Sequence, residues 1–190
     1  LNAVVESVRD SVSLLVESED GDVVALANGL FDLRTKELRP FSPKVVLTSK
    51  ASVAFREGAT TCPVMDDGWS VDEWIRELAN NDPEVEQLFW EIIAALFRPE
   101  HPFKKAALLY SPTGSNGKGT FLELLRHLVG VDRVATLSIS DFGEQFLPEA
   151  LCSAFAVLSD ENEVGDFLRK AGAFKAWVTH DWIQLNVKYG

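Results

Sequence analysis

The chain has 190 residues, a length that fits one ordinary domain or two small ones. Hydrophobic residues make up 46% and charged residues 25%, which excludes a wholly disordered chain. The net charge of −11 excludes a protein that coats DNA through a generally basic surface, because such binding neutralises phosphates with Lys and Arg. The apolar runs fall far short of the roughly 20 residues of a membrane span, and we expect a cytoplasmic protein without one.

The first third of the chain predicts one helix followed by short strands. Apolar spacing indicates a helix over residues 2–18. Strands are predicted for residues 23–26, 30–33, 37–40, 45–48 and 52–55. The polar residues 34–36 predict the turn of a hairpin, and residues 57–69 a loop. We therefore assign residues 1–64 to an N-terminal helix and a β-rich lead-in segment, and the start at Leu1 makes us expect a piece of a longer protein.

A small helical domain is predicted for residues 65–104. Ser70 followed by Glu73 fits a capping box, and the helix after it should run to about Asn80. Asp82 and Pro83 fit the start of a second helix. Its apolar stripe follows helical spacing and predicts core or partner surface: Val85, Leu88, Phe89, Ile92, Ile93, Leu96 and Phe97.

The pattern changes to an α/β type in residues 105–190. The apolar run 106–110 predicts a buried strand, residues 121–128 a helix and residues 155–158 a second buried strand. Apolar strands that alternate with helices indicate a parallel sheet. The fold class that we predict is therefore α/β.

Between the first of these strands and its helix lies a glycine-rich loop that is typical of phosphate binding. Its glycines let backbone N–H groups approach phosphate oxygens, and the following helix directs its positive end at the same anion. Lys118 would contact the β- and γ-phosphates, and the hydroxyl of Thr120 would contribute to a Mg²⁺ site. The predicted ATP-binding residues are Thr113, Gly114, Ser115, Asn116, Gly117, Lys118, Gly119 and Thr120. Two positions depart from the usual pattern: Pro112 replaces the first glycine, and Gly119 follows the lysine.

The second strand ends in two carboxylates, Asp160 and Glu161. Asp160 would hold Mg²⁺, directly or through water, and Glu161 would act as a base on the attacking water. The alternative interpretation is that the two carboxylates only mark the point where the strand reaches solvent. The position of the pair after a phosphate loop favours the catalytic interpretation.

Other reactive or aromatic side chains predict no site. Cys62 and Cys152 lack metal-ligand spacing and should be reduced. The tryptophans form no base-stacking set in the sequence, and we expect core packing for Trp69, Trp74, Trp90, Trp177 and Trp182.

Several segments, in order, resemble the superfamily 3 helicases of phages and plasmids, the helicase half of primase–helicase replication proteins. They are the Asn-Gly-Leu-Phe-Asp-Leu-Arg-Thr lead-in at 28–35, the helical region at 65–104, the Gly-Ser-Asn-Gly-Lys-Gly-Thr loop, the Ser-Asp-Glu-Asn segment at 159–162, and residues 175–188. The resemblance covers roughly residues 23–190. The loop alone is shared by many ATPases, whereas the ordered set is much more specific.

The resemblance implies a P-loop NTPase core that ends before the sensor strand, so that the isolated fragment should turn over little ATP. In the intact protein it implies an ATP-dependent DNA helicase, active as a ring that is a hexamer in the family, on single-stranded or forked DNA in the cytoplasm of a bacterial host. A primase domain or partner is a further implied feature. Lys175 and Lys188 become candidate DNA contacts, with ordinary surface lysines as the alternative. Thr179 and His180 stand where the family commonly has glycines.

Three alternatives remain. A nucleoside monophosphate kinase uses a similar loop, but only 72 residues follow Lys118, too few for its acceptor site and lid. A folate or cell-wall precursor ligase would leave the lead-in and the acidic pair unexplained. A nucleotide-regulated oligomerisation or DNA-loading module would bind ATP without consuming it, and Pro112 and Gly119 favour that reading.

Overall fold

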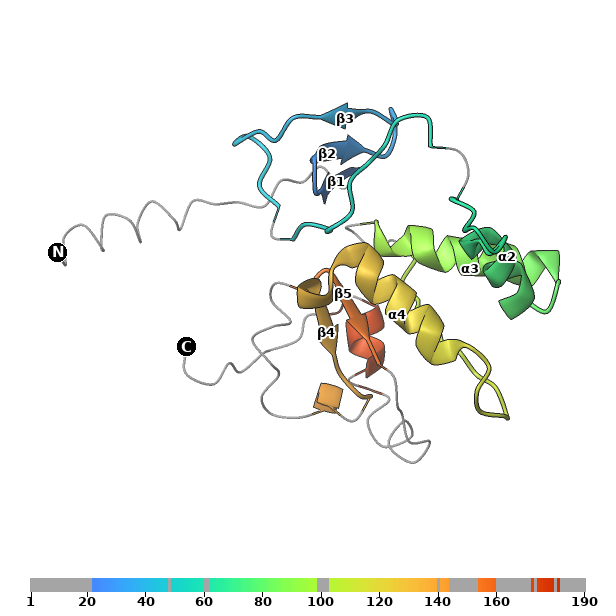
Figure 1. Cartoon of the computed structure of the whole chain (residues 1–190). Helices are drawn as coiled ribbons and strands as arrows, with labels where there is room; N and C mark the ends of the chain where they lie inside the picture. Colours follow the sequence, from blue (N-terminus) through green and yellow to red (C-terminus); the bar gives the residue numbers. More distant parts are fainter. Residues whose placement is uncertain are drawn as a thin grey trace.

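The computed structural model describes residues 22–47, 49–59, 62–98, 103–139, 141–143, 154–159, 172, 174–179 and 181. Figure 1 shows a small sheet, formed by β1 (Val23–Leu26), β2 (Gly29–Asp32) and β3 (Leu38–Arg39), above the helices α3 (Pro83–Leu96) and α4 (Lys118–Val129). A second strand pair, β4 (Val134–Thr136) and β5 (Ala156–Leu158), lies behind α4. The predicted helix over residues 2–18 lies outside the described residues.

The lead-in segment folds as a three-stranded antiparallel sheet. Its strands are β1 (Val23–Leu26), β2 (Gly29–Asp32) and β3 (Leu38–Arg39), in the order β1-β2-β3. All four residues of β1 are buried. The hairpin predicted around residues 34–36 is confirmed, because β2 and β3 pair across it.

The strands predicted at 45–48 and 52–55 are wrong for the residues described there, none of which is in a strand. Isolated hydrogen bonds run alongside β1 instead: Ala51 N–H donates to the Ala25 carbonyl, and Ala27 N–H to that of Val53. A ladder needs consecutive bonds of this kind. The segment therefore follows the sheet without becoming part of it.

Three residues of the lead-in motif have structural roles in this sheet. The Asn28 amide donates to the Phe55 carbonyl at 2.8 Å and accepts from the Phe55 N–H at 2.9 Å. A Cβ on Gly29 would lie 2.5 Å from the carbonyl oxygen of Arg39, so the strands can approach this closely only at a glycine. Asp32 is buried and accepts from the Arg39 guanidinium and from two backbone N–H groups. The motif therefore shapes the sheet.

The surroundings of Asp32 favour its charged form. The backbone N–H of Thr35, which donates to the carboxylate, lowers the pKa of Asp32 below its ordinary value. Burial opposes this shift, and the Arg34 N–H and the positive charges of Arg39 and Arg34 add to it. The hairpin is therefore held by an ionised carboxylate.

Both helices predicted in the middle of the chain are confirmed. Helix α2 spans Val71–Leu78, and its N-cap Ser70 accepts from the Glu73 N–H at 3.2 Å. Helix α3 spans Pro83–Leu96, and its N-cap Asp82 accepts from the N–H groups of Glu84 and Val85. Both N-termini are thus satisfied by side chains of this chain, as the sequence indicates.

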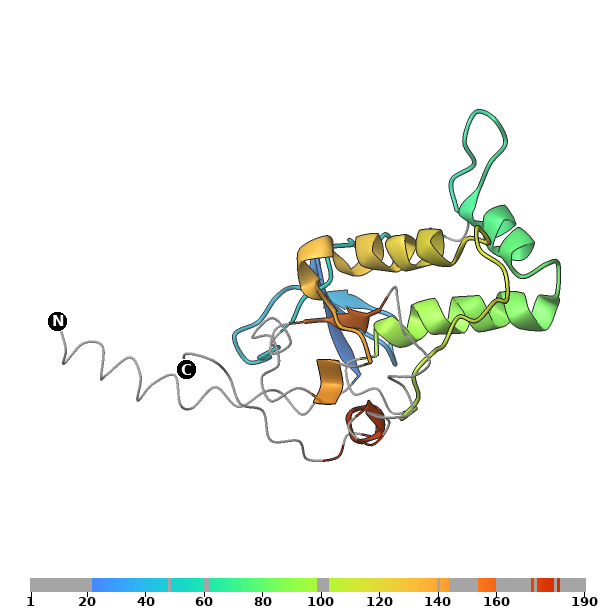
Figure 2. The ribbon, with the colours of Figure 1, turned by 90° about the horizontal axis from the view of Figure 1, so that it is seen from below.

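Helix α4 (Lys118–Val129) begins three residues before the predicted start at Phe121. It packs beside a two-stranded parallel sheet of β4 (Val134–Thr136) and β5 (Ala156–Leu158). The sequence predicted β5 but not β4. Leu158 belongs to the buried cluster of Phe121, whereas Val157 packs with Trp177. Figure 2 shows α4 on one side of this sheet and the helical residues 174–178 on the other.

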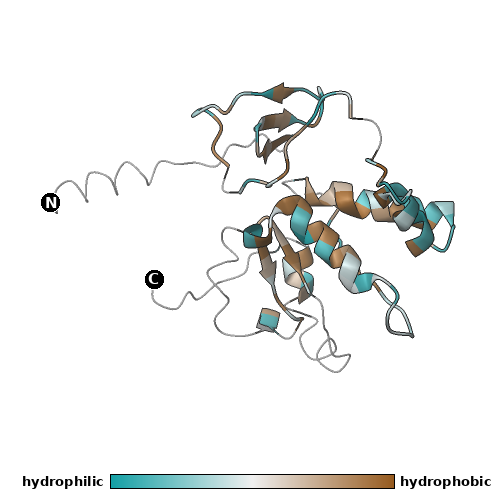
Figure 3. Ribbon diagram, in the orientation of Figure 1, coloured by the Kyte–Doolittle hydropathy of each residue, from teal (hydrophilic) through white to brown (hydrophobic). Residues whose placement is uncertain are grey.

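The lead-in sheet is joined to the rest of the chain at two places. Ser52 N–H donates to the carbonyl of Val129, the last residue of α4, at 3.0 Å. The rings of Phe97, just after α3, and Phe155, just before β5, meet with centroids 5.9 Å apart and pack against the buried cluster of Val24, Leu26 and Ala51. Figure 3 shows hydrophobic residues along β1, β2 and the C-terminal half of α3, where these parts meet.

Candidate nucleotide-binding site

The segment before the glycine-rich loop differs from its prediction. Residues 106–110 form no strand, and the side chains of Leu108 and Tyr110 are 72% and 83% exposed. Leu109 alone packs against the core. A buried strand needs hydrogen-bonded neighbours, and in the described ranges β4 and β5 pair only with each other. The expected buried strand is therefore wrong for this structure.

The loop that follows turns sharply in front of α4. Ser115 and Gly117 both have left-handed backbone conformations, with φ of 55° and 82°. A Cβ on Gly117 would lie 2.7 Å from the Leu78 methyl carbon of α2. Residue 117 therefore needs glycine for its backbone angle and for the close approach of α2.

Lys118 is the first residue of α4 and is half-buried. Its ammonium donates to the Asn116 side-chain oxygen at 2.6 Å, and the Asn116 amide donates to the Thr113 carbonyl at 2.8 Å. The loop thus holds its own lysine in place. An anion that approaches the ammonium would compete with the Asn116 oxygen.

The N-terminus of α4 differs from those of α2 and α3. No side chain caps it, and its first turn has no acidic residue, whereas the first turn of each of the other two helices carries two acids. The unpaired N–H groups at a helix start and the helix dipole both attract anions. With Lys118 as its first residue, α4 presents donors and a positive charge that no side chain of the described residues neutralises there.

Space for a ligand exists beside the same backbone. A Cβ built on Gly114 or on Gly119 would meet nothing within 4 Å, and Thr113, Ser115 and Thr120 are exposed. A phosphate chain could approach the amides of this loop without displacing a side chain. The predicted residues 113–120 therefore lie together in one turn, and the Thr120 side chain is exposed among the described residues.

The acidic pair, Asp160 and Glu161, lies outside the described residues, as do His180 and Lys188. The strand before the pair is placed: Leu158 belongs to the same buried cluster as Phe121, three residues after Lys118. Lys175 is exposed and belongs to the helical residues 174–178. In the part of the chain that the structure describes, no three potential ligands gather as a metal site.

Two features of the site were not anticipated. The specific contact of Asn116 with Lys118 has a weak sequence signal, an amide two residues before the lysine. The contact of Leu78 with Gly117 has none, because it joins residues that are 39 positions apart.

Elsewhere, burial raises the pKa of the Cys62 thiol, and the Asp72 carboxylate adds to that shift, so this cysteine is not activated as a nucleophile. Core packing is confirmed for Trp74, Trp90 and Trp177 but is wrong for Trp69, which is 48% exposed. Trp182 lies outside the described residues.

Comparison with known families divides the chain into two matched parts. Residues 1–88 match the family described as D5 N terminal like. The N-terminal part is similar to primase–helicase proteins of phages and plasmids. Residues 109–190, which include the glycine-rich loop, match a family of unknown function, DUF5906. The first match supports a replication protein of the primase–helicase type.

Among curated proteins, none matches the chain. None of the helices in the described ranges is long and apolar enough to cross a membrane.

Proposed function

We propose that this chain carries the nucleotide-binding part of an ATP-dependent DNA helicase that acts in phage or plasmid replication. The similarity of residues 1–88 to D5-like proteins supports the replication context. The proposal of an ATPase rests on the residues around the start of α4. We further propose that residues 105–190 belong to a P-loop NTPase core with a parallel sheet, to which β4 and β5 contribute.

One observation carries the proposal: α4 begins with a half-buried lysine, an uncapped N-terminus and no acid in its first turn. The same chain caps α2 and α3 with Ser70 and Asp82 and places acids behind both caps. An uncapped, positive helix start behind a left-handed glycine turn is the arrangement that binds phosphate. The exposed backbone at Gly114 and Gly119 supplies the access.

The proposed chemistry is the in-line attack of water on the γ-phosphate of ATP. Lys118 would leave Asn116, contact the β- and γ-phosphates and offset the charge that develops in the transition state. Thr120 and Asp160 are the proposed ligands of Mg²⁺, which supplies further positive charge to the phosphates. Glu161 is the proposed base that orients the water. Lys175 and Lys188 stay proposed contacts for single-stranded or forked DNA, and a ring of subunits, a hexamer by the resemblance, is the proposed active form.

The direct test is calorimetric titration of the chain with ATP and ADP in the presence of Mg²⁺. The proposal predicts saturable binding that Lys118→Ala abolishes. The matched control is Lys105→Ala, which removes an exposed lysine 13 positions earlier and should leave the dissociation constant unchanged. Equal loss in both variants, or binding that survives Lys118→Ala, would contradict a phosphate site at this loop.

Hydrolysis separates the two functional candidates in the full-length protein. A helicase requires ATP turnover that single-stranded DNA stimulates and Glu161→Gln removes, with nucleotide binding retained. ATP-dependent assembly without turnover would instead favour the oligomerisation or loading module. The contact of Lys118 with Asn116 fits either case, because a bound phosphate has to replace it in both.

A further inference from the structure

An exposed turn projects from the chain just before α2. Figure 2 shows this segment extending away from the helices. Val64, Met65 and Trp69 are 68%, 58% and 48% exposed. Met65 N–H donates to the Trp69 carbonyl at 2.8 Å, and Gly68 N–H to the Met65 carbonyl at 2.9 Å. The turn, residues 64–69, thus presents large apolar side chains from a backbone that is already ordered.

Acidic residues stand at the tip of the same turn. Asp66 and Asp67 are exposed, and neither forms an ion pair in the part of the chain that the structure describes. The Asp67 carboxylate accepts from the backbone N–H of Trp69 at 3.0 Å, which holds it within the turn. A partner for this turn therefore needs an apolar hollow next to a positive charge.

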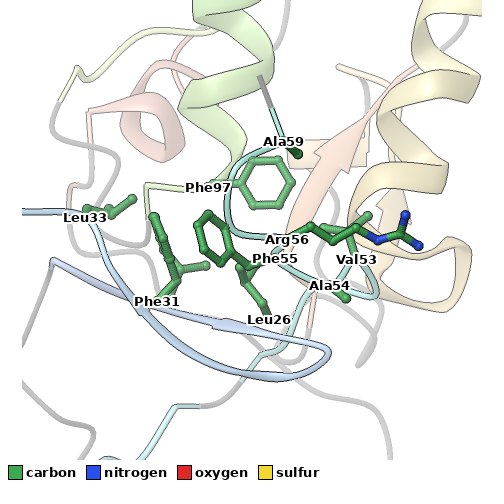
Figure 4. A pocket seen from close by; sticks show the side chains of 10 residues that line it. Leu26, Phe31, Leu33, Val53, Ala54, Phe55, Arg56, Ala59 and Phe97 are labelled. Atoms are coloured by element: carbon green, nitrogen blue, oxygen red, sulfur yellow. The ribbon is translucent and has the colours of Figure 1, made fainter. Parts of the chain in front are cut away.

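Such a hollow lies elsewhere in the chain, between the lead-in sheet and the end of α3. It is a cavity of about 440 Å³, a volume within the range of ligand pockets. Its lining is almost wholly apolar and includes Phe31, Phe55 and Phe97. Figure 4 shows these three rings gathered together, with the Arg56 side chain extending away from them past Val53. The Arg56 guanidinium has no ion pair among the described residues.

We propose that the 64–69 turn of one copy of this chain inserts Trp69 into the sheet cavity of a second copy, where Asp66 and Asp67 meet Arg56. The apolar tip matches the apolar lining, and the acids match the one charged residue of the lining. Tryptophan and arginine are the residue types that most often dominate the energy of an interface. Desolvation of the indole supplies affinity, and the charge pairs fix the orientation.

The occupant is a second copy because the two surfaces cannot meet within one chain. Both overall views place the turn beside α2, whereas the cavity lies where the sheet meets Phe97 after α3. The two surfaces differ, and no described residue covers either of them, so each copy offers one turn and one cavity. A contact of this kind is head-to-tail, and it continues from copy to copy until it closes into a ring or forms a filament. The inference does not depend on nucleotide binding.

Sedimentation velocity over a concentration series tests the contact. The proposal predicts concentration-dependent association of the chain, with a dissociation constant that rises at least about 10-fold in Trp69→Ala. The control is Phe41→Ala, which removes an equally exposed aromatic residue outside the cavity and should change nothing. A chain that stays monomeric at every concentration, or association that Trp69→Ala leaves unchanged, overturns the proposal.

Mixing variants tests the direction of the contact. Ala59→Trp fills the cavity from an exposed position and leaves the turn intact. Mixed with Trp69→Ala, it leaves one working turn and one working cavity, so a dimer and nothing larger should form.

Charge reversal gives a second route that does not depend on filling the cavity. Arg56→Glu alone and Asp66→Lys with Asp67→Lys should each weaken association. A mixture of the two proteins should restore it, because the unaltered turn of one fits the unaltered cavity of the other and the two reversed charges also pair. Larger species in the first mixture, or no restoration in the second, contradict a head-to-tail contact through these residues.

Discussion

Residues 22–98 and residues 103–129 handle their polar groups in opposite ways. In the first region, the Asn28 amide binds the Phe55 backbone, Asp32 pairs with Arg39, and Ser70 and Asp82 cap their helices. In the second, residues 104–110 make no backbone hydrogen bond to other described residues, and α4 begins without a cap. In the first region, the polar groups of the sheet and of the two helix starts are satisfied by side chains of the same region. In the second, the start of α4 and residues 104–110 have no such partners among the described residues.

The difference teaches where to look for function in this chain. The lead-in motif, with its Asn, Gly, Asp and Arg residues, has the composition of a chemical site but serves the sheet. The start of α4 has no acid in its first turn and no side-chain cap among the described residues, and our proposal of a phosphate site rests on that feature. Unsatisfied groups therefore indicate the site better than clusters of polar residues do.

The largest expected effect is on a fully buried side chain of the second region. Phe121 is fully buried in α4, and its ring meets that of Phe89 in α3 with centroids 4.8 Å apart. Phe121→Ala should destabilise the chain by about 3–5 kcal/mol, because a cavity opens between α3, α4 and β5. Urea unfolding measures it, with exposed Leu108→Ala as the control. A loss below about 1 kcal/mol would mean that α4 is held by other contacts.

A glycine pair sharpens the comparison between the regions. Gly29→Ala places a methyl group against the Arg39 carbonyl and should cost about 1–3 kcal/mol. Gly119→Ala meets nothing and lies inside a helix, so it should stabilise by about 0.5–1 kcal/mol. Thermal unfolding of the two variants should therefore shift in opposite directions. Equal losses would show that α4 is packed as tightly at its start as the lead-in sheet.

The caps provide a smaller effect. Asp82→Ala removes the acceptor of two N–H groups at the start of α3 and should cost about 1 kcal/mol. Asp82→Asn, which retains a cap, should recover most of that loss. If neither variant changes the denaturation midpoint, the Asp82 cap does not contribute measurably to the free energy of unfolding.

Acid should weaken the lead-in sheet through Asp32. Because the pKa of Asp32 is lower in the folded chain than its ordinary value, its charged form stabilises folding at neutral pH. This contribution is present above the ordinary pKa of Asp and is lost as the pH falls through the lowered value. Asp32→Asn should flatten the acid limb of the stability profile, and an unchanged limb would assign the acid sensitivity to other carboxylates.

Elements whose contacts are local were predictable from the sequence. The β2–β3 hairpin and the two capped helices follow from residues within ten positions of one another. The prediction of a strand at 106–110 was wrong because a strand in a parallel sheet needs hydrogen-bonded neighbours from distant parts of the chain. An apolar run does not indicate whether such neighbours are present. Strand β4 was not predicted because it is three residues long and shows neither a flanking turn motif nor an alternation of apolar and polar residues.

The candidate site divides in the same way. The loop and Lys118 were predicted from glycine spacing, since that spacing is itself the local requirement for phosphate binding. The packing of Leu78 against Gly117 was not, because it depends on how α2 docks on α4. The exposure of Trp69 was missed for a related reason: a tryptophan in a sequence does not reveal that its turn stands away from the core.

Amide hydrogen exchange with and without ATP and Mg²⁺ tests most directly the claim that the second region stays open until a nucleotide binds. Peptides from residues 22–39 should be protected in both states. Peptides from residues 106–120 should exchange fast in the free chain and slow down with nucleotide, in the unaltered chain and in Lys105→Ala but not in Lys118→Ala. Protection of residues 106–120 equal to that of residues 22–39 before nucleotide is added, or exchange there that ATP leaves unchanged, would contradict the account.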